Sequence, residues 1–288
     1  MDWREAISKA DAYLAAKGVP DPRTAAELLA ARLLRTGCGE LVSRMAQEPD
    51  PRHLDAMRRG MARLVKGEPL QYVLGEWDFR HLTLSCDKRA LIPRPETEGL
   101  VSLVLSDLSS RRDAGGAAPF VVDVGTGTGA IVLSIAREFD GEAVLLGTDV
   151  SEDAVALAKE NAERCGLSDR VKFAVADGLD DFDEPGCVDI IVSNPPYVES
   201  AVCETLDPRV RDWEPRLALD GGESGLDFYE RYLADAMNLL KPGGSVHFEI
   251  GESQGAALRR LMSDFGFEEI TIGKDLSGRD RYASAHLR

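Results

Sequence analysis

The sequence predicts an α/β fold, a doubly wound parallel sheet, preceded by a small helical bundle. Apolar, β-branched runs at residues 120–124, 143–148 and 190–193 are typical of strands buried on both faces of such a sheet. A glycine-rich turn at residues 125–129 leads from the first of these strands directly into a helix. Residues 1–75 instead carry apolar residues at three-and-four spacing, which indicates amphipathic helices.

Length and composition predict a soluble globular protein. Its 288 residues allow one large and one small domain, and 44% are hydrophobic and 29% charged. No apolar run approaches the roughly 20 residues that cross a bilayer, and the N-terminus has no signal-peptide core. The five cysteines form no C-x-x-C pair, which argues against a zinc site and a disulfide framework. We expect a cytoplasmic protein without metal or membrane contact.

The negative charge is concentrated in the larger part of the chain. Residues 1–80 hold 13 Lys and Arg against 12 Asp and Glu, whereas residues 81–288 hold 21 against 38. A surface that grips a polyanion normally gathers Lys and Arg. The balance therefore disfavours nucleic acid as the substrate and leaves a protein partner open.

The N-terminal helices, interrupted at residues 18–22, carry no catalytic constellation, so we interpret residues 1–75 as a docking module. A β-hairpin is expected from residues 71–79 and 82–85, within a linker region at residues 76–98. Two prolines bracket Arg94, which lies either in a plain linker or at the rim of a site, and Thr97 is placed to cap the next helix. After a polar loop at residues 106–118, the sheet would be built within a third region, residues 99–288.

Polar groups follow successive strands of the predicted sheet. The turn at residues 125–129 lets backbone approach a ligand closely and aims helix N–H groups at it. Asp149 ends the second strand, where a carboxylate can accept ribose hydroxyls, and Asp177 with Gly178 follows the third, where a carboxylate can receive an adenine amino group. We expect these residues to lie along one edge of the sheet.

The last part of the chain completes the sheet. The pattern predicts a helix at residues 227–240, a turn at residues 241–244 and a fifth strand at residues 245–251. A helix at residues 253–265 and two strands, near residues 267–272 and 282–287, close the sheet. His247 alternates within a strand and is expected to be a packed core residue.

The fourth strand ends in Asn194-Pro195-Pro196-Tyr197. Proline holds the residue before it extended, so Asn194 stands at the carboxyl end of the strand, where ligands bind in open parallel sheets. The Asn194 amide oxygen and the Pro195 carbonyl can accept both hydrogens of a substrate –NH2 group, and Tyr197 offers a flat wall beside it. The alternative is a tight loop, since Asn and Pro are common turn residues.

The glycine turn alone does not separate two cofactors. Gly125-x-Gly127-x-x-Ala130 also satisfies a loose dinucleotide fingerprint, which leaves NAD open beside S-adenosylmethionine (AdoMet). A dinucleotide fold usually needs a second βαβ half, whereas here one α/β unit is followed by the Asn-Pro-Pro-Tyr strand end and a closing strand pair. AdoMet is the better fit.

A resemblance narrows this prediction. The glycine turn with Asn-Pro-Pro-Tyr looks like that of AdoMet-dependent amino methyltransferases, and motifs over essentially the whole chain resemble the bacterial release factor glutamine methyltransferases (the PrmC/HemK family). These further motifs lie at residues 67–72, 91–98, 225–229, 249–254 and 275–281. The resemblance implies a seven-stranded class I methyltransferase domain after a helical one. It also implies AdoMet as methyl donor, S-adenosylhomocysteine as product, and methylation of the glutamine side chain in the Gly-Gly-Gln loop of peptide chain release factors.

Residue roles carry over from the family by position. The resemblance assigns the cofactor to Gly125, Thr126, Gly127, Thr128, Gly129, Asp149, Asp177, Gly178 and Asn194, and the glutamine to Asn194, Pro195, Pro196 and Tyr197. Two departures concern local packing. Arg80-His81 stands where the family more often has an aromatic residue and a glycine, and Gly178 stands where a bulkier residue is frequent.

Two other functions use the same residues. Methylation of adenine or of a small amide would need the same amide holder, by which we mean the Asn194 amide oxygen with the Pro195 carbonyl, but the charge balance and the length of the resemblance disfavour it. A catalytically idle AdoMet-binding adaptor has no chemical need of an intact Asn194-Pro195-Pro196-Tyr197.

Overall fold

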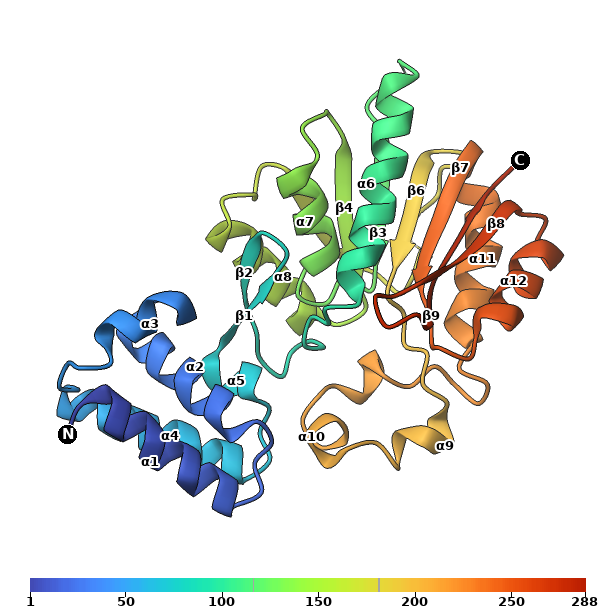
Figure 1. The fold of residues 1–288 in the computed structure, drawn as a ribbon. Helices are drawn as coiled ribbons and strands as arrows, with labels where there is room; N and C mark the ends of the chain where they lie inside the picture. The colour runs from blue at the N-terminus through green and yellow to red at the C-terminus, as the bar shows by residue number, and fades with distance from the viewer. Residues whose placement is uncertain (116, 181) are drawn as a thin grey trace. The chain divides into compact units, whose positions relative to one another are not determined.

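A computed structural model describes residues 1–115, 117–180 and 182–288, which form two compact units (Figure 1). The first unit comprises Met1–Glu76 together with Asp207–Trp213, and the second comprises Trp77–Leu206 and Glu214–Arg288. Most of the stretch expected as a separate linker, residues 76–98, thus lies in the second unit. Residues 207–213, expected in the third region, group with the helical unit, which nothing in their sequence indicated.

The first unit is helical, as the three-and-four spacing predicts. Its helices are α1 (Trp3–Ala16), α2 (Pro22–Leu34), α3 (Cys38–Arg44), α4 (Pro51–Val65), α5 (Leu70–Leu74) and α10 (Pro208–Arg211). Asp2 caps α1 and Asp50 caps α4, each accepting a backbone N–H at the start of its helix. The expected strand over residues 71–79 is wrong in its first half: Pro69 precedes α5, and Gly75, with φ 74°, ends it in a left-handed cap.

The second unit contains the predicted doubly wound sheet. Its seven strands are β3 (Phe120–Val124), β4 (Val144–Asp149), β5 (Val171–Val175), β6 (Val188–Ser193), β7 (Leu240–Glu249), β8 (Glu268–Lys274) and β9 (Asp280–His286). They are ordered β5-β4-β3-β6-β7-β9-β8, and β9 runs in the direction opposite to the other six of these strands. The strand order reverses between β3 and β6, which is where open α/β sheets bind ligands.

Helices cover both faces of this sheet (Figure 1). Residues of α6 (Thr97–Asp113), α7 (Ala130–Glu138) and α8 (Glu152–Arg164) share one core with β3 and β6 side chains such as Val121 and Ile190. Residues of α11 (Asp227–Leu239) and α12 (Gly255–Asp264) share the other core with side chains such as Val122 and Ile191. The alternation of neighbouring residues between two apolar cores explains why these strands read as continuous apolar runs.

A two-stranded hairpin, β1 (Glu76–Phe79) and β2 (Leu82–Ser85), precedes α6. Arg80, one of the departures from the family pattern, occupies the turn with φ 49°, a conformation that glycine adopts without strain. Its guanidinium bonds both oxygens of Glu138, the Glu98 carbonyl and the Ser102 hydroxyl. These charge-assisted hydrogen bonds hold the turn against α6 and α7.

Two expected irregular segments belong to regular elements. The loop at residues 106–118 is wrong as far as Asp113, where α6 ends; residue 116 lies outside the described residues. Ser109 and Ser110 donate to carbonyls four residues back, so polar side chains are accommodated in the helix. The turn at residues 241–244 is a bulge within β7. Leu240 pairs with Val188 and Ser245 pairs with Ile190, so the extra residues lie on β7.

His247 is a packed residue, as expected. It is buried, with Nδ1 2.9 Å from Ser284 Oγ and Nε2 3.1 Å from Asp107 Oδ2. A Ser–His–Asp set suggests a hydrolase triad, but Ser284 is buried too, so this network ties α6 to β7 and β9. In the described part of the chain no helix is long and apolar enough to cross a membrane.

Candidate active site

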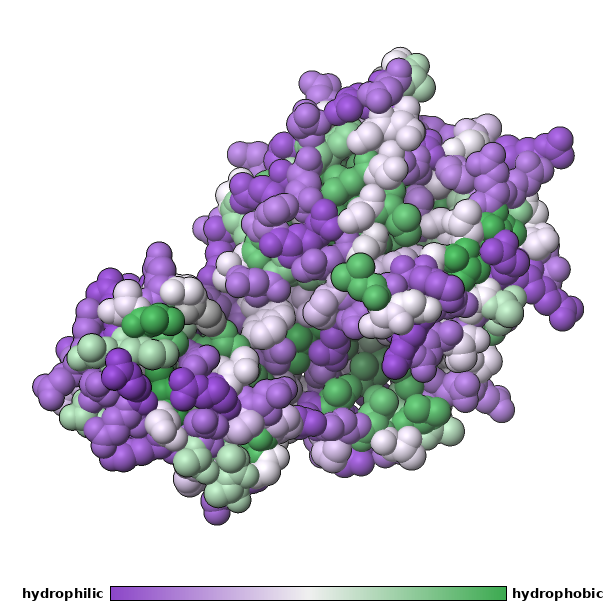
Figure 2. All heavy atoms as spheres, in the orientation of Figure 1, coloured by the Kyte–Doolittle hydropathy of each residue, from purple (hydrophilic) through white to green (hydrophobic). Residues whose placement is uncertain are grey.

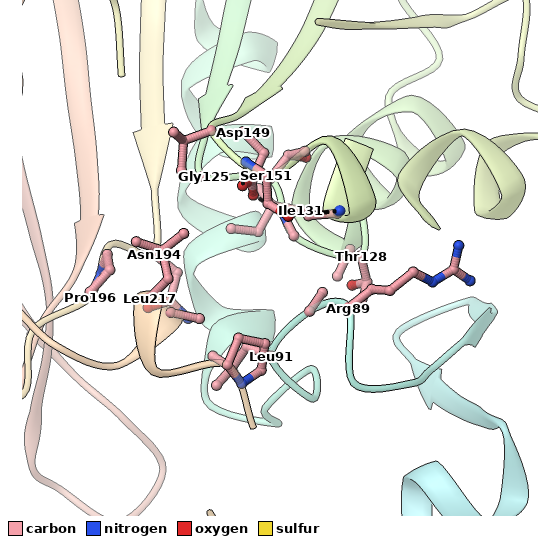
Figure 3. Close-up of a pocket in the computed structure, with 18 of the residues that line it drawn as sticks. Arg89, Leu91, Gly125, Thr128, Ile131, Asp149, Ser151, Asn194, Pro196 and Leu217 are labelled. Carbon is pink, nitrogen blue, oxygen red and sulfur yellow. Dashed lines mark hydrogen bonds between the residues drawn. The ribbon is translucent and has the colours of Figure 1, made fainter. Parts of the chain in front are cut away.

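The candidate site is a pocket at the carboxyl ends of the central strands (Figure 3). It brings together most of the predicted residues: Gly125, Thr126, Gly127, Thr128, Asp149, Asp177, Gly178, Asn194 and Pro196. Gly129, Pro195 and Tyr197 are not among its lining residues. β3 and β6 are paired neighbours with Val124 opposite Ser193, so Gly125 and Asn194 each follow directly on an aligned strand end.

The glycine turn has the backbone that its sequence predicts. Gly125, Gly127 and Gly129 have φ of 72°, 55° and 80°, which side chains of L-residues rarely adopt. A Cβ on Gly129 would lie 2.9 Å from Leu133 Cδ1, so Gly129 serves helix packing at the start of α7 rather than the pocket surface. The turn leaves backbone and the N-terminus of α7 open to a ligand.

Asp149 is fixed by the backbone around it. Oδ2 accepts the Gly127 N–H and Oδ1 accepts the Ser151 N–H, both at 2.9 Å. Burial raises the pKa of the carboxyl, although these two hydrogen bonds lower it. Each carboxylate oxygen has a second lone-pair site, so Asp149 can still accept hydroxyl groups from a ligand in the pocket.

Asp177 and Gly178 lie at the same pocket, next to aromatic side chains of α11. Arg231 donates to Asp177 Oδ1 at 2.7 Å, which orients that carboxylate. A Cβ on Gly178 would lie 3.1 Å from the ring of Tyr232, and Tyr232 and Phe228 line the pocket. The second departure from the family pattern is thereby explained: the space that a bulkier residue would fill is taken by Tyr232.

Asn194 presents one end of its amide to the pocket. Nδ2 donates to Thr97 Oγ1 at 3.3 Å, and Thr97 donates to Glu249 Oε2 at 2.6 Å. Among the described residues Asn194 Oδ1 has no hydrogen-bond partner. The amide oxygen is therefore available to a donor in the pocket.

Tyr197 does not line this pocket. Its hydroxyl is 3.4 Å from Glu249 Oε1, and burial together with this carboxylate raises its pKa to about 12. Burial also raises the pKa of Glu249, which the Thr97 hydrogen bond and the Arg281 charge lower. Tyr197 thus contacts Glu249, the support of Asn194, and its role as a flat wall beside the glutamine stays a prediction.

A clamp around the Asn-Pro-Pro-Tyr backbone was not apparent from the sequence alone. Gln254 Nε2 donates to the carbonyls of Tyr197 and Gly225 at 3.1 and 3.0 Å, while its Oε1 accepts the Gly251 N–H at 2.8 Å. A Cβ on Gly225 would lie 2.5 Å from the Tyr197 carbonyl oxygen. The motifs at residues 225–229 and 249–254 therefore converge on one task, holding this turn in place.

Two segments distant in sequence form the rim. Arg94 donates to Glu214 Oε1 at 2.6 Å, and the Ile92 N–H donates to Oε2 at 3.1 Å. Leu91 and Leu217, from the two joined segments, line the pocket and are labelled in Figure 3. The two prolines around Arg94 thus mark a rim, the second of the two interpretations left open by the sequence.

The arrangement suits a ligand with a nucleoside and a second reactive part. It offers a carboxylate, open backbone of a glycine turn, aromatic rings and, a strand away, a free amide oxygen. Within residues 1–115, 117–180 and 182–288 no group of three His, Cys, Asp or Glu side chains could hold a metal ion.

Family models match both parts of the chain. A PrmC N-terminal domain model matches residues 5–75, and a methyltransferase domain model matches residues 119–265. Among solved structures, the hMettl16 catalytic domain in complex with MAT2A 3′UTR hairpin 6 aligns with a TM-score of 0.59 at 20% identity, covering 81% of each chain. The delta-N METTL16 MTase domain aligns at 0.55 with 23% identity, covering 77% of this chain and 95% of that one. These likenesses confirm the class I methyltransferase fold.

Relatives that align over most of their length are named release factor glutamine methyltransferases. The release factor glutamine methyltransferase of Moorella thermoacetica is 37% identical over 100% of this chain and 99% of its own length. That of Agrobacterium fabrum is 37% identical over 93% and 91%, and the human MTRF1L release factor glutamine methyltransferase is 34% identical over 94% and 83%. The chain therefore belongs to the release factor glutamine methyltransferase family.

Proposed function

We propose that this protein transfers a methyl group from AdoMet to the side-chain amide nitrogen (N5) of the glutamine in the Gly-Gly-Gln motif of peptide chain release factors, in the cytoplasm. The observation that carries the proposal is the free Oδ1 of Asn194 in the same pocket as the glycine turn and Asp149. An amide acceptor beside a nucleoside site suits the methylation of an –NH2 group.

The pocket residues fit AdoMet. Asp149 would accept the ribose hydroxyls, and this role is supported by the two backbone N–H groups that orient its oxygens at the end of β4. Phe228 and Tyr232, with ring centroids 6.0 Å apart, offer apolar surface beside Asp177 and Gly178 for the adenine. The open turn at Gly125 and Gly127 leaves room for the methionine part, since a Cβ at Gly125 would meet nothing within 4 Å.

The chemistry requires a well-oriented nitrogen. The lone pair of an amide nitrogen is delocalised, so it is a poor nucleophile, and bound AdoMet supplies a methyl group on a sulfonium with a good leaving group. Asn194 Oδ1 and the Pro195 carbonyl would accept the two N–H bonds of the glutamine, which orients the nitrogen and favours the positive charge developing on it. The proton leaves to water or a nearby carbonyl after the transfer.

A direct test is to incubate the protein with AdoMet and a peptide chain release factor and to measure the mass of the peptide that contains Gly-Gly-Gln. We expect a gain of one methyl group on the glutamine. A release factor with this glutamine replaced by asparagine is the matched control and should stay unmodified. Methylation at a residue other than this glutamine would contradict the proposal, and so would the absence of methylation with a folded release factor.

The helical unit is proposed to dock the release factor. A groove between α1 and α4 is lined by Met1, Ala6, Lys9, Ala10, Tyr13, Leu54, Met57, Arg58 and Met61. Tyr13 is 44% exposed there, and apolar residues interrupt the hydrophilic surface of this unit in the view of Figure 2. Aromatic and Met side chains are enriched at protein interfaces. The residues that hold a single glutamine cannot recognise a whole protein, so additional contact surface is needed.

A further inference from the structure

We propose that Thr97 is a positioning residue for methyl transfer: with Glu249 it fixes the amide of Asn194 so that Oδ1, not Nδ2, faces the substrate. This inference rests on the proposed function, in which Asn194 Oδ1 accepts an N–H of the substrate amide. The Oδ1 and Nδ2 ends of the Asn194 amide have nearly the same shape, so something must keep the amide in one orientation.

With Glu249 ionised, the hydrogen-bond chain permits only one orientation. A threonine hydroxyl has one proton, and Thr97 donates it to Glu249 Oε2 at 2.6 Å. Only lone pairs of Thr97 Oγ1 then face Asn194, so the group that meets them must be a donor, Nδ2, at 3.3 Å. A flipped amide would set Oδ1 against these lone pairs and turn Nδ2 toward the substrate –NH2, so it would lose two hydrogen bonds at once.

Both supporting residues are fixed in the core. Thr97 is 4% exposed and Glu249 is 1% exposed, so water does not compete for their hydrogen bonds. Glu249 lies at the end of β7, where its carbonyl accepts the Tyr229 hydroxyl at 2.8 Å.

The start of α6 is held as tightly. The Tyr282 hydroxyl donates to the carbonyl of Glu96 at 2.6 Å, next to Thr97. This contact needs a glycine at position 99, because a Cβ there would lie only 2.2 Å from the same hydroxyl. Thr97 is therefore held in place independently of any ligand.

The consequence for catalysis is preorganisation. Without the hydroxyl of Thr97, the Asn194 amide can adopt both orientations, and only one of them accepts the substrate N–H. Substrate binding involves many other contacts, whereas the orientation of the nitrogen matters for the transfer step itself. Loss of Thr97 Oγ1 should therefore lower kcat more than it raises KM.

The test compares Thr97→Val, which keeps the shape without the hydroxyl, with Thr97→Ser, which keeps the hydroxyl. With release factor and AdoMet we expect Thr97→Val to lower kcat about tenfold or more, with KM for release factor and the AdoMet Kd within about twofold of wild type. Thr97→Ser should recover most of the lost rate. Thr97→Ala removes the same hydroxyl and replaces Thr97→Val in this comparison if thermal unfolding shows that the valine variant is not folded.

The outcomes separate this inference from the proposed function. If Thr97→Val turns over at the wild-type rate while Asn194→Ala does not, positioning by Thr97 is wrong and the amide holder stands. If Thr97→Ser is as slow as Thr97→Val, only the shape of threonine matters and the inference is also wrong. Wild-type turnover in Asn194→Ala would instead overturn the holder itself.

Discussion

The hydroxyl of Ser193 donates to the carbonyl of Val124 at 2.6 Å, and Ser193 is fully buried. This hydrogen bond ties the last residue of β6 to the last residue of β3 beneath the pocket. Gly125 and Asn194 are the next residues on each strand, so the glycine turn and the amide holder keep a fixed spacing. A methyl donor and an acceptor nitrogen need such a spacing for in-line transfer.

Replacing Asn194 by alanine should separate catalysis from cofactor binding. We expect Asn194→Ala to reduce methyl transfer by ~10²-fold or more, the scale seen when one preorganised polar contact to a transition state is lost. AdoMet binding should change little, because Asp149 and the glycine turn remain. Turnover assays and calorimetry check the two halves of this prediction, and near-normal turnover would contradict it.

Asp149→Ala should instead weaken AdoMet binding. The ribose hydroxyls would lose a charged acceptor worth roughly 1.5–3 kcal/mol, so the AdoMet Kd should rise by about tenfold or more. Calorimetry measures the Kd directly, and Glu152→Ala, an exposed carboxylate at the start of α8, is the matched control. An unchanged Kd in Asp149→Ala would mean that this strand end does not hold the cofactor, and NAD should then be tested.

The central features of the site could be predicted because they are local. The Gly125 turn, Asp149 and Asn194 each follow an apolar strand, and parallel strands bring their carboxyl ends to one edge. The hydrogen bond of Tyr197 could not be predicted in this way. A short motif gives the residues that come after the strand but not which of their side chains turn back into the core, and Tyr197 turns toward Glu249.

The supporting contacts could not be predicted because they join distant segments. Gln254 lies 57 residues from Tyr197, and Glu214 lies 120 residues from Arg94. The sequence did mark Gln254 and Glu214, because each lies among Gly, Pro and charged residues. Such a run does not indicate which distant residue the side chain will contact. The extension of α6 to Asp113 was missed for another reason. Ser-rich sequence usually favours loops, but here the Ser109 hydroxyl donates to a backbone carbonyl of its own helix, so the helix continues.

The Gln254 clamp should be required for turnover. Gln254→Glu keeps the size and the acceptor for Gly251, but places a carboxylate oxygen against the carbonyls of Tyr197 and Gly225 in place of two donated hydrogen bonds. We expect kcat to fall roughly 10- to 100-fold, since a small displacement of the holder is costly. Glu252→Gln, an exposed change in the same turn, is the control. Equal kcat values for both variants would contradict a clamping role.

Asp123 should make stability depend on pH. It is fully buried beneath the glycine turn, and burial raises its pKa to about 7. Below about pH 4 both the folded and the unfolded chain hold the proton, so no penalty applies. Between about pH 4 and 7 the unfolded chain releases the proton first, so the contribution to stability is lost as pH rises toward 7.

Asp123→Asn removes this titration. The amide oxygen can still accept from Thr126, and the free energy of unfolding of the variant relative to wild type should therefore increase from pH 5 to pH 8. Urea unfolding at both pH values measures the difference, with the exposed Asp169→Asn as control. A relative stability that is the same at both pH values would show that Asp123 is ionised throughout.

The groove between α1 and α4 gives the last prediction. If the helical unit docks the release factor there, Tyr13→Ala should lower kcat/KM for intact release factor about tenfold, the effect of removing an aromatic anchor of an interface. A short Gly-Gly-Gln peptide presents only the residues around the glutamine, so its methylation should be unchanged. Val42→Ala, on α3 and 68% exposed, removes apolar surface outside the groove and should affect neither substrate.

Point variants are preferable to deletion of residues 1–75, because residues 207–213 pack within the same unit and would lose their partners. Equal kcat/KM for intact release factor in Tyr13→Ala and wild type would exclude Tyr13 as an anchor, and a parallel loss with the peptide would place the defect in the catalytic unit instead.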